Sequence, residues 1–272
     1  MTEWPADLLL VGAGKMGGAM ARGWLDAGLP ASSLTVLEPN PSHEIASLLA
    51  DRGVSLNPGR AITPPEMLVL AVKPQSLDEA APQIAALASG STLVLSIIAG
   101  KTIANLGARL PQARALVRAM PNTPAAIGRG VTAAFANAKV NVDQQGWCER
   151  LLAAVGAFFW LDDEAAIDAV TAISGSGPAY VFALTEALAA AAERLGLPAD
   201  LSMKLARGTV EGAAELMRRE GETSPATLRR NVTSPGGTTA AALAVLQDTN
   251  GLDDLMARAT GAARARAAEM AG

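Results

Sequence analysis

The sequence predicts an α/β domain with a parallel sheet, followed by an all-α domain. Up to about residue 162, short apolar runs alternate with segments of helical periodicity, and beyond residue 163 the strand patterns stop. Strands that are apolar on both faces are typical of a parallel sheet covered by helices. The 272 residues are enough for two domains, which we expect to span 1–163 and 164–272.

The expected elements of the first domain alternate along the chain. The run from Leu8 to Val11 is the first strand, and the helix after it ends before Gly28 and Pro30. Further strands are expected at 34–37, 67–72, 92–98, 114–120, 131–135 and 158–161, and helices at 16–26, 42–50 and 76–87.

The second domain is expected to be entirely helical. Pro178 and Pro198 stand at helix starts, where the missing N–H has no helical partner to lose. The expected helices span 164–173, 178–194, 199–219, 225–230, 239–247 and 251–270. Their Ala-rich faces suit either the core of a bundle or an interface between subunits, and the density of small residues favours the interface.

The composition argues against several kinds of function. A net charge of −4 disfavours a nucleic-acid partner, which requires a basic face. No uncharged apolar run reaches the ~20 residues of a membrane helix, and the N-terminus lacks the basic start of a signal peptide, so a cytoplasmic protein is expected. A single histidine, His43, and a single cysteine, Cys148, argue against a zinc site or a Ser-His-Asp triad. The chemistry is therefore expected to come from an organic cofactor.

A glycine-rich turn joins the first strand to the first helix. Gly12, Gly14 and Gly17 form the pattern G-x-G-x-x-G, which permits a tight turn, close approach of a pyrophosphate and close packing of helix on strand. The helix N-terminus adds free N–H groups and a favourable dipole. This context predicts a Rossmann-like dinucleotide-binding domain rather than a turn without a ligand. The expected cofactor contacts here are Val11, Gly12, Ala13, Gly14, Lys15, Met16 and Gly17.

Two residues bear on the choice between NAD and NADP. Glu38 ends the second strand, 21 residues after Gly17, where an acidic side chain usually binds the ribose hydroxyls and repels a 2′-phosphate. Arg60 either reaches the same ribose or is a solvated surface charge. Both are candidate cofactor contacts, and they leave the preference open.

A second loop with glycines and hydroxyl groups precedes a helix of the second domain. It combines N–H groups at Gly237, Thr238 and Thr239 with a favourable dipole for an anion. In the simpler interpretation, Ser234 or Thr238 caps the helix. A cap needs one hydroxyl, whereas the loop 232–239 has four, at Thr233, Ser234, Thr238 and Thr239. A small carboxylate is therefore the expected ligand.

A third glycine-rich segment, from Ser174 to Pro178, opens the first long helix of the second domain. It is a helix start with proline in the first turn. Its small residues also suit the floor of a nicotinamide pocket. The two interpretations are compatible.

Taken together, these segments resemble the pyrroline-5-carboxylate reductase family. The motifs match in order from about residue 7 to the C-terminus, and the Ser-Pro-Gly-Gly-x-Thr element is the most specific of them. The matching segments are 12–17, 71–75 (Ala-Val-Lys-Pro-Gln), 120–124 (Met-Pro-Asn-Thr-Pro), 174–180 (Ser-Gly-Ser-Gly-Pro-Ala-Tyr) and 232–243.

The resemblance implies reduction of (S)-1-pyrroline-5-carboxylate to L-proline with NADPH or NADH. Glu38 departs from the small or amide residue common in the family, and Arg60 stands where an asparagine meets the 2′-phosphate in some members. The implied assembly is a homodimer, or a ring of dimers, held together by an all-α dimerisation domain.

The resemblance also assigns roles to single residues. The substrate carboxylate is expected at Ser234, Gly237 and Thr238. Thr239 is expected beside the ring nitrogen, and Glu222 matches an acidic residue discussed as a proton relay. The cofactor site is extended by Ala71, Val72, Lys73 and Pro74.

Other functions share parts of this pattern. A β-hydroxyacid dehydrogenase would need a helical lysine, and only Lys204 lies beyond residue 139, without that family's surrounding pattern. A reductase of another cyclic imine is an alternative. A non-catalytic dinucleotide sensor would have no use for the loop from Ser234 to Thr239.

Overall fold

The computed structural model describes residues 3–59 and 61–271, which divide into two compact units. The first comprises the chain up to Ser176 together with the residues from Ala263 onward, and the second comprises Gly177–Ala262. Residues 166–176 therefore belong to the unit with the sheet, although their sequence pattern groups them with the helices that follow.

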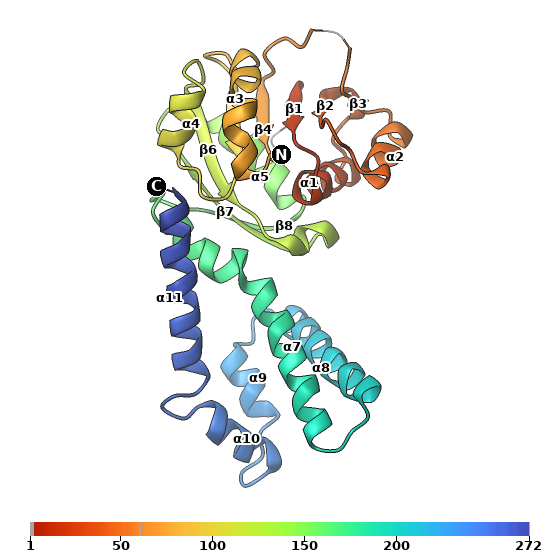
Figure 1. Ribbon diagram of the computed structural model, residues 1–272, viewed down its shortest axis with the longest axis vertical. Helices are drawn as coiled ribbons and strands as arrows, with labels where there is room; N and C mark the ends of the chain where they lie inside the picture. Colours follow the sequence, from red (N-terminus) through yellow and green to blue (C-terminus); the bar gives the residue numbers. More distant parts are fainter. Residues whose placement is uncertain (1–2, 60, 272) are drawn as a thin grey trace. The chain divides into compact units, whose positions relative to one another are not determined.

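The first unit is built on an eight-stranded sheet with the order β3-β2-β1-β4-β5-β6-β7-β8 (Figure 1). The strand order reverses between β1 and β4. In doubly wound folds ligands bind at such a switch point, outside the carboxyl ends of the strands. The strands are β1 (Leu8–Val11), β2 (Leu34–Leu37), β3 (Ser55–Leu56), β4 (Met67–Leu70), β5 (Leu93–Ser96), β6 (Ala115–Met120), β7 (Gly130–Ala136) and β8 (Gly156–Trp160). All seven expected strands are present, with ends within two residues of those expected.

One pairing departs from the all-parallel sheet that the sequence predicts. β7 runs antiparallel to β6, with Ala119 opposite Ala134, while β8 is parallel to β7. Only residues 121–129 connect β6 to β7, and they contain the 3₁₀ helix η3 (Thr123–Ile127). A parallel crossover needs about a dozen residues or more, so this short connection reverses the chain instead.

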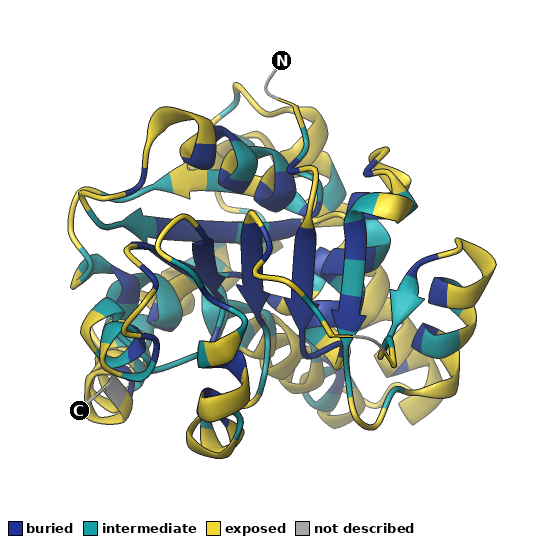
Figure 2. Cartoon of the chain, turned by 90° about the horizontal axis from the view of Figure 1, so that it is seen from above, coloured by how far each residue is buried: buried dark blue, intermediate teal, exposed yellow. Residues whose placement is uncertain are grey.

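Helices cover both faces of the sheet because successive strand residues point to opposite sides. Leu8 and Leu10 pack with α1, α2 and α5, whereas Leu9 and Val11 pack with α3 and α4. The central strands are buried between these layers (Figure 2). The helices of this unit are α1 (Lys15–Asp26), α2 (His43–Asp51), α3 (Leu77–Ala86), α4 (Ile103–Arg109), α5 (Val142–Ala153) and α6 (Ala166–Val170), followed by the π-helical turn η4 (Thr171–Gly175).

Two helices, α4 and α5, were not predicted. Each begins with a capping box, in which Thr102 pairs with Asn105 and Asn141 pairs with Gln144. Each box satisfies two N–H groups that would otherwise have no partner at the helix start. Cys148 of α5 is fully buried, and burial raises the pKa of its thiol, as expected for a packing residue rather than a reactive one.

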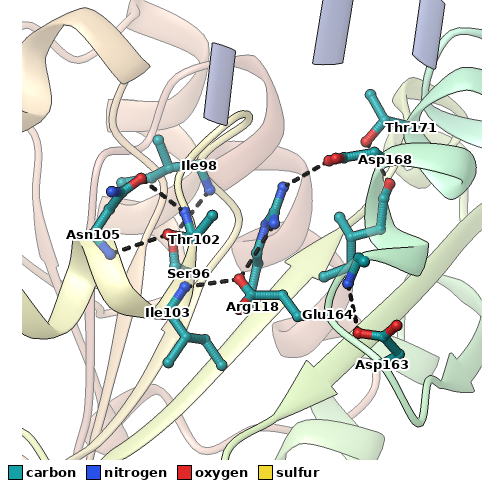
Figure 3. A network of polar contacts seen from close by, with 12 residues as sticks. Ser96, Ile98, Thr102, Ile103, Asn105, Arg118, Asp163, Glu164, Asp168 and Thr171 are labelled. Carbon is teal, nitrogen blue, oxygen red and sulfur yellow. Dashed lines mark hydrogen bonds and ion pairs between the residues drawn. The ribbon is translucent and has the colours of Figure 1, made fainter. Parts of the chain in front are cut away.

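A buried ion-pair network joins β6 to α4 and α6 (Figure 3). The guanidinium of Arg118 lies 3.3 Å from Glu164 and 3.4 Å from Asp168. Glu164 also accepts a hydrogen bond of 2.8 Å from the N–H of Ile103, at the start of α4. Because Arg118 is 4% exposed, this pairing balances the loss of hydration of its charge. The network fixes the beginning of the helical segment 164–168 to the sheet.

The second unit is helical, as the sequence predicts. It consists of α7 (Gly177–Arg194), α8 (Ala199–Arg219), α9 (Pro225–Asn231), α10 (Thr238–Leu246) and the first part of α11 (Leu252–Ala271). α7 leaves large apolar side chains exposed, including Val181, Phe182 and Leu184. By length and composition alone, the helical stretch 166–194 would also suit a membrane span, with a mean hydropathy of 1.2.

Candidate active site

Two glycines of the turn 12–17 are required by the protein's own backbone. Gly12 has a φ of 95°, and a Cβ there would lie 2.7 Å from the carbonyl carbon of Ala71. A Cβ on Gly17 would lie 2.1 Å from the carbonyl oxygen of Gly12. A side chain at either position would force β1, α1 and the loop after β4 apart.

Gly14 differs from both neighbours because a Cβ there would meet no atom within 4 Å. Gly14 is exposed at the N-cap of α1, and no side chain among the described residues caps this helix. The N–H groups at this helix start thus have no side-chain cap among the described residues, and a phosphate is their natural partner. This arrangement fits a pyrophosphate as the sequence predicts.

The loop after β4 lies against the glycine turn. The N–H of Ala71 donates to the carbonyl of Val11 at 2.8 Å, which extends the β1–β4 pairing to the switch point. Lys73 is exposed at the N-cap of the 3₁₀ helix η2 (Pro74–Ser76). The structure thus brings 71–74 beside 12–17, although their contacts with a cofactor remain predictions.

Glu38 reaches back from the end of β2 to the same turn. Its carboxylate accepts hydrogen bonds from the N–H of Ala13 at 2.8 Å and of Asn40 at 3.0 Å. Asn57 holds the backbone of Glu38, because its side chain accepts from the Glu38 N–H at 2.9 Å and donates to the Glu38 carbonyl at 2.7 Å. The negative charge is therefore fixed beside the glycine turn. Arg60, the other residue expected here, lies outside the described residues.

Asn57 was not found from the sequence. It has a φ of 47°, and it is the only described residue other than glycine with a positive φ. Asparagine tolerates this conformation because its short side chain makes local hydrogen bonds. The one signal in the sequence was an asparagine directly after the short apolar run that forms β3, since asparagine favours such a turn.

The loop before α10 also begins a helix without a side-chain cap. Gly237 is the N-cap of α10, and neither Ser234 nor Thr238 caps the helix among the described hydrogen bonds. The Gly237 N–H donates to the Ser234 carbonyl at 3.1 Å, and a Cβ on Gly237 would lie 2.5 Å from the Ser234 hydroxyl. The capping interpretation is therefore wrong. The Thr233 hydroxyl donates to the Arg229 carbonyl at 2.6 Å, which leaves the hydroxyl groups of Ser234, Thr238 and Thr239 as candidates for a ligand.

Other sequence candidates in the second unit lie on exposed positions. Glu222 is exposed in the turn between α8 and α9, and among the described residues no hydrogen bond or ion pair joins it to the loop before α10. Lys204 is exposed on α8 and pairs with Asp200 at 2.6 Å. Such a solvated lysine disfavours the β-hydroxyacid dehydrogenase alternative.

The third glycine-rich segment begins inside a π-helical turn that was not predicted. The Ser176 N–H donates to the carbonyl of Thr171 at 2.8 Å, five residues earlier. The side chain of Asn122 donates to the Ser174 carbonyl at 2.9 Å. Such turns often lie at functional sites. Sequence patterns of helical periodicity do not distinguish them from α-helix.

Comparison with known proteins agrees with this geometry. Residues 164–270 match the family of the pyrroline-5-carboxylate reductase dimerisation domain, and residues 8–100 match the family of coenzyme F420-dependent NADP oxidoreductases. The chain is 42% identical to a pyrroline-5-carboxylate reductase of Pseudomonas aeruginosa over 266 residues, 97% of this chain and 96% of the other. It is 35% identical to a pyrroline-5-carboxylate reductase of Haemophilus influenzae, over 97% of both chains.

Solved structures give the same result. A pyrroline-5-carboxylate reductase from Coxiella burnetii superposes with a TM-score of 0.88 at 35% identity, over 98% of this chain and 99% of the other. A pyrroline carboxylate reductase from Plasmodium falciparum with NADP bound gives 0.80 at 27% identity, over 98% of both chains. These similarities extend over both units and include both helix starts described above. The chain is an NAD(P)H-dependent oxidoreductase that acts on a C=N bond and belongs to the pyrroline-5-carboxylate reductase family.

Proposed function

We propose that this protein reduces (S)-1-pyrroline-5-carboxylate to L-proline in proline biosynthesis, with the residue roles given below. The observation that supports it most strongly is the loop from Ser234 to Thr239, a helix start whose hydroxyl groups are not used as caps. A dinucleotide site alone would support any dehydrogenase. A second anion site with hydroxyl donors selects a small carboxylate substrate.

The glycine turn and the loop after β4 hold the dinucleotide. The free N–H groups at the start of α1 bind the pyrophosphate, and Glu38 lies beside the adenosine ribose. Lys15, Met16 and the segment 71–74 complete the cofactor site. When bound, the reduced nicotinamide supplies the hydride.

The loop before α10 holds the substrate. Ser234 and the N–H of Thr238 bind the carboxylate, and Thr239 hydrogen-bonds the ring nitrogen as its positive charge disappears. The N–H of Gly237, which was expected to bind the carboxylate too, already donates to the Ser234 carbonyl, so Gly237 contributes by its lack of a side chain. An imine is basic enough to bind in the protonated form, so the protein needs no strong acid. Glu222, exposed next to α9, relays protons from solvent. The protein contributes positioning and electrostatics rather than covalent chemistry.

The protein works as a cytoplasmic homodimer or a ring of dimers, with no nucleic-acid or membrane partner. Val181, Phe182 and Leu184 of α7 are 45%, 64% and 56% exposed in the single chain. Exposed apolar side chains of this kind mark an interaction surface. A second copy of α7 would cover them, which also accounts for the apolar stretch 166–194 without a membrane.

The test is a direct assay. The purified protein is mixed with pyrroline-5-carboxylate and either NADH or NADPH, and the loss of reduced nicotinamide is followed by absorbance, with proline identified as the product. We expect turnover with at least one cofactor. No turnover with either would refute the proposal. Turnover of other cyclic imines at a higher kcat/KM would favour the broader imine reductase alternative, and cofactor binding without turnover would favour a sensor.

A further inference from the structure

Pro178 leaves the carbonyl of Ser174, in the π-helical turn 171–175, without its usual helical partner. In an α-helix the carbonyl of Ser174 would accept from the N–H of residue 178, four positions later. Residue 178 is proline, which has no N–H. Ser174 is partly buried, and a carbonyl that is shielded from water and has no partner destabilises the fold, so a donor from outside the helix stabilises the turn.

Asn122 provides that donor and ties the turn to the sheet. Its side-chain amide donates to the Ser174 carbonyl at 2.9 Å, and its side-chain oxygen accepts from the N–H of Val131 at 2.8 Å. Asn122 lies two residues after the end of β6 and is only 7% exposed. Asn122 therefore links the Ser174 carbonyl to the backbone of β7 from its place in the β6–β7 connection.

A second contact brings the same turn close to β6. A Cβ on Gly175 would lie 2.8 Å from the methyl carbon of the Met120 side chain. Glycine at this position thus lets the backbone of the turn approach the carboxyl end of β6. Together, the contacts of Asn122 and Gly175 hold residues 174–176 at that edge of the sheet.

This edge is where the nicotinamide half of a dinucleotide belongs. The fold has two mononucleotide-binding halves on either side of the switch point between β1 and β4. Glu38 marks the adenosine half at the end of β2. The other half therefore lies over the carboxyl ends of β4, β5 and β6, and Asn122 comes two residues after the last of these.

We propose that Asn122 is a positioning residue for the nicotinamide. It acts through the backbone of 174–176, which it holds against β6 as one wall of the nicotinamide pocket. This inference rests on the proposed function. Asn122 need not touch the reacting atoms. The placement of the nicotinamide depends on Asn122, whereas the binding of the adenosine half does not.

The matched control is Asn137, which makes the same kind of bridge at the opposite end of β6. Its side chain accepts from the Leu116 N–H at 3.2 Å and donates to the Arg114 carbonyl at 2.8 Å. Asn122→Ala removes two side-chain hydrogen bonds to backbone. Asn137→Ala removes three, because the Asn137 side chain also accepts from the N–H of Lys139 at 3.2 Å. Both variants should lose thermal stability, but only Asn122→Ala changes the carboxyl end of the strand.

The experiment measures kcat with pyrroline-5-carboxylate, Tm, and the Kd of ADP-ribose, a probe that lacks the nicotinamide. For Asn122→Ala we expect kcat to fall about tenfold or more, because small misplacements are costly in hydride transfer, while ADP-ribose binds within about twofold of wild type. For Asn137→Ala kcat should stay within about twofold of wild type. The inference would be overturned if Asn122→Ala and Asn137→Ala had the same kcat. It would also be overturned if Asn122→Ala lost as much affinity for ADP-ribose as it lost in kcat.

A second variant distinguishes positioning from simple stabilisation. Pro178→Ala restores an N–H four residues after Ser174, so in the Asn122→Ala background the carbonyl regains a helical partner without the tie to β6. We expect the double variant to recover part of the lost Tm, since the Val131 N–H still lacks its acceptor, while kcat stays low. Recovery of kcat together with Tm would show that Asn122 only satisfies a carbonyl. A lack of turnover in the wild-type protein would instead refute the proposed function. The Kd of ADP-ribose can be measured whether or not the protein turns over the imine.

Discussion

The starts of α1 and α10, both without a side-chain cap, differ in what requires their glycines. At 12–17 the constraint is backbone against backbone, with a Cβ of Gly17 only 2.1 Å from the Gly12 carbonyl oxygen. At the start of α10 the constraint is a side chain, because the Ser234 hydroxyl occupies the space beside Gly237. The first site is therefore a pure backbone surface, which suits a cofactor common to many enzymes. The second presents hydroxyl groups, which can select one substrate.

The largest effect is expected from breaking the first site. Gly17→Ala places a methyl group against the Gly12 carbonyl, so we expect NADH binding to be lost. Gly14→Ala is the matched control within the turn, since its methyl group would meet only the bound cofactor. Measured by Tm and the Kd of NADH, Gly14→Ala should keep wild-type stability and bind NADH more weakly. Normal NADH affinity in Gly17→Ala would contradict the assignment of the turn.

The next effect is expected at Thr239, on the catalytic side of the second site. Thr239→Ala should lower kcat with pyrroline-5-carboxylate about tenfold to a hundredfold, because one hydrogen bond to the reacting nitrogen is lost. The Kd of NADH should not change. Thr233→Ala is the matched control, since the Thr233 hydroxyl donates to the Arg229 carbonyl at 2.6 Å and is already used by α9. Equal kcat values for the two variants would remove Thr239 from the mechanism.

A smaller effect is expected at Ser234, which binds the part of the substrate that does not react. Ser234→Ala should raise KM for pyrroline-5-carboxylate about tenfold, equivalent to about 1.4 kcal/mol, with little change in kcat. Steady-state kinetics at saturating NADH gives both constants. If Ser234→Ala changes the affinity for NADH but not KM for the imine, Ser234 binds the cofactor and its assignment to the substrate is wrong.

The smallest effect concerns cofactor preference. Glu38→Gln keeps an oxygen for the Ala13 N–H but removes the charge, so the ratio of kcat/KM for NADPH to that for NADH should rise about fivefold. Arg60→Ala should lower the same ratio if Arg60 meets the 2′-phosphate. An unchanged ratio in Glu38→Gln would mean that the carboxylate does not face the adenosine ribose.

Local sequence patterns were enough for seven of the eight strands and for both helix starts, whereas the two-residue strand β3 was not predicted. The apolar runs gave the strands because parallel strands are buried on both faces, as β1 and β4 are. The direction of β7 was missed, since apolar alternation says nothing about direction and only the short connection 121–129 decides it. α4 and α5 were missed because the signal at their starts is a capping box rather than periodicity.

Residues that act through tertiary contacts could not be found from the sequence. Asn122 makes its two hydrogen bonds to residues 9 and 52 positions away, and neither separation corresponds to a local motif. Glu38 was predicted, but its partner Asn57 was not, because their contact follows from the β2–β3 pairing. The buried pairs of Arg118 likewise join residues 46 and 50 positions apart, at no spacing that a local motif would give.

The central claim is that the second helix start selects its substrate through the carboxylate. The most direct measurement compares kcat/KM for pyrroline-5-carboxylate with that for 1-pyrroline, the same ring without the carboxylate, in wild type and Ser234→Ala. We expect a strong preference for pyrroline-5-carboxylate in wild type and about tenfold less in the variant, with 1-pyrroline turned over equally by both. Equal kcat/KM for the two imines in wild type would contradict the claim.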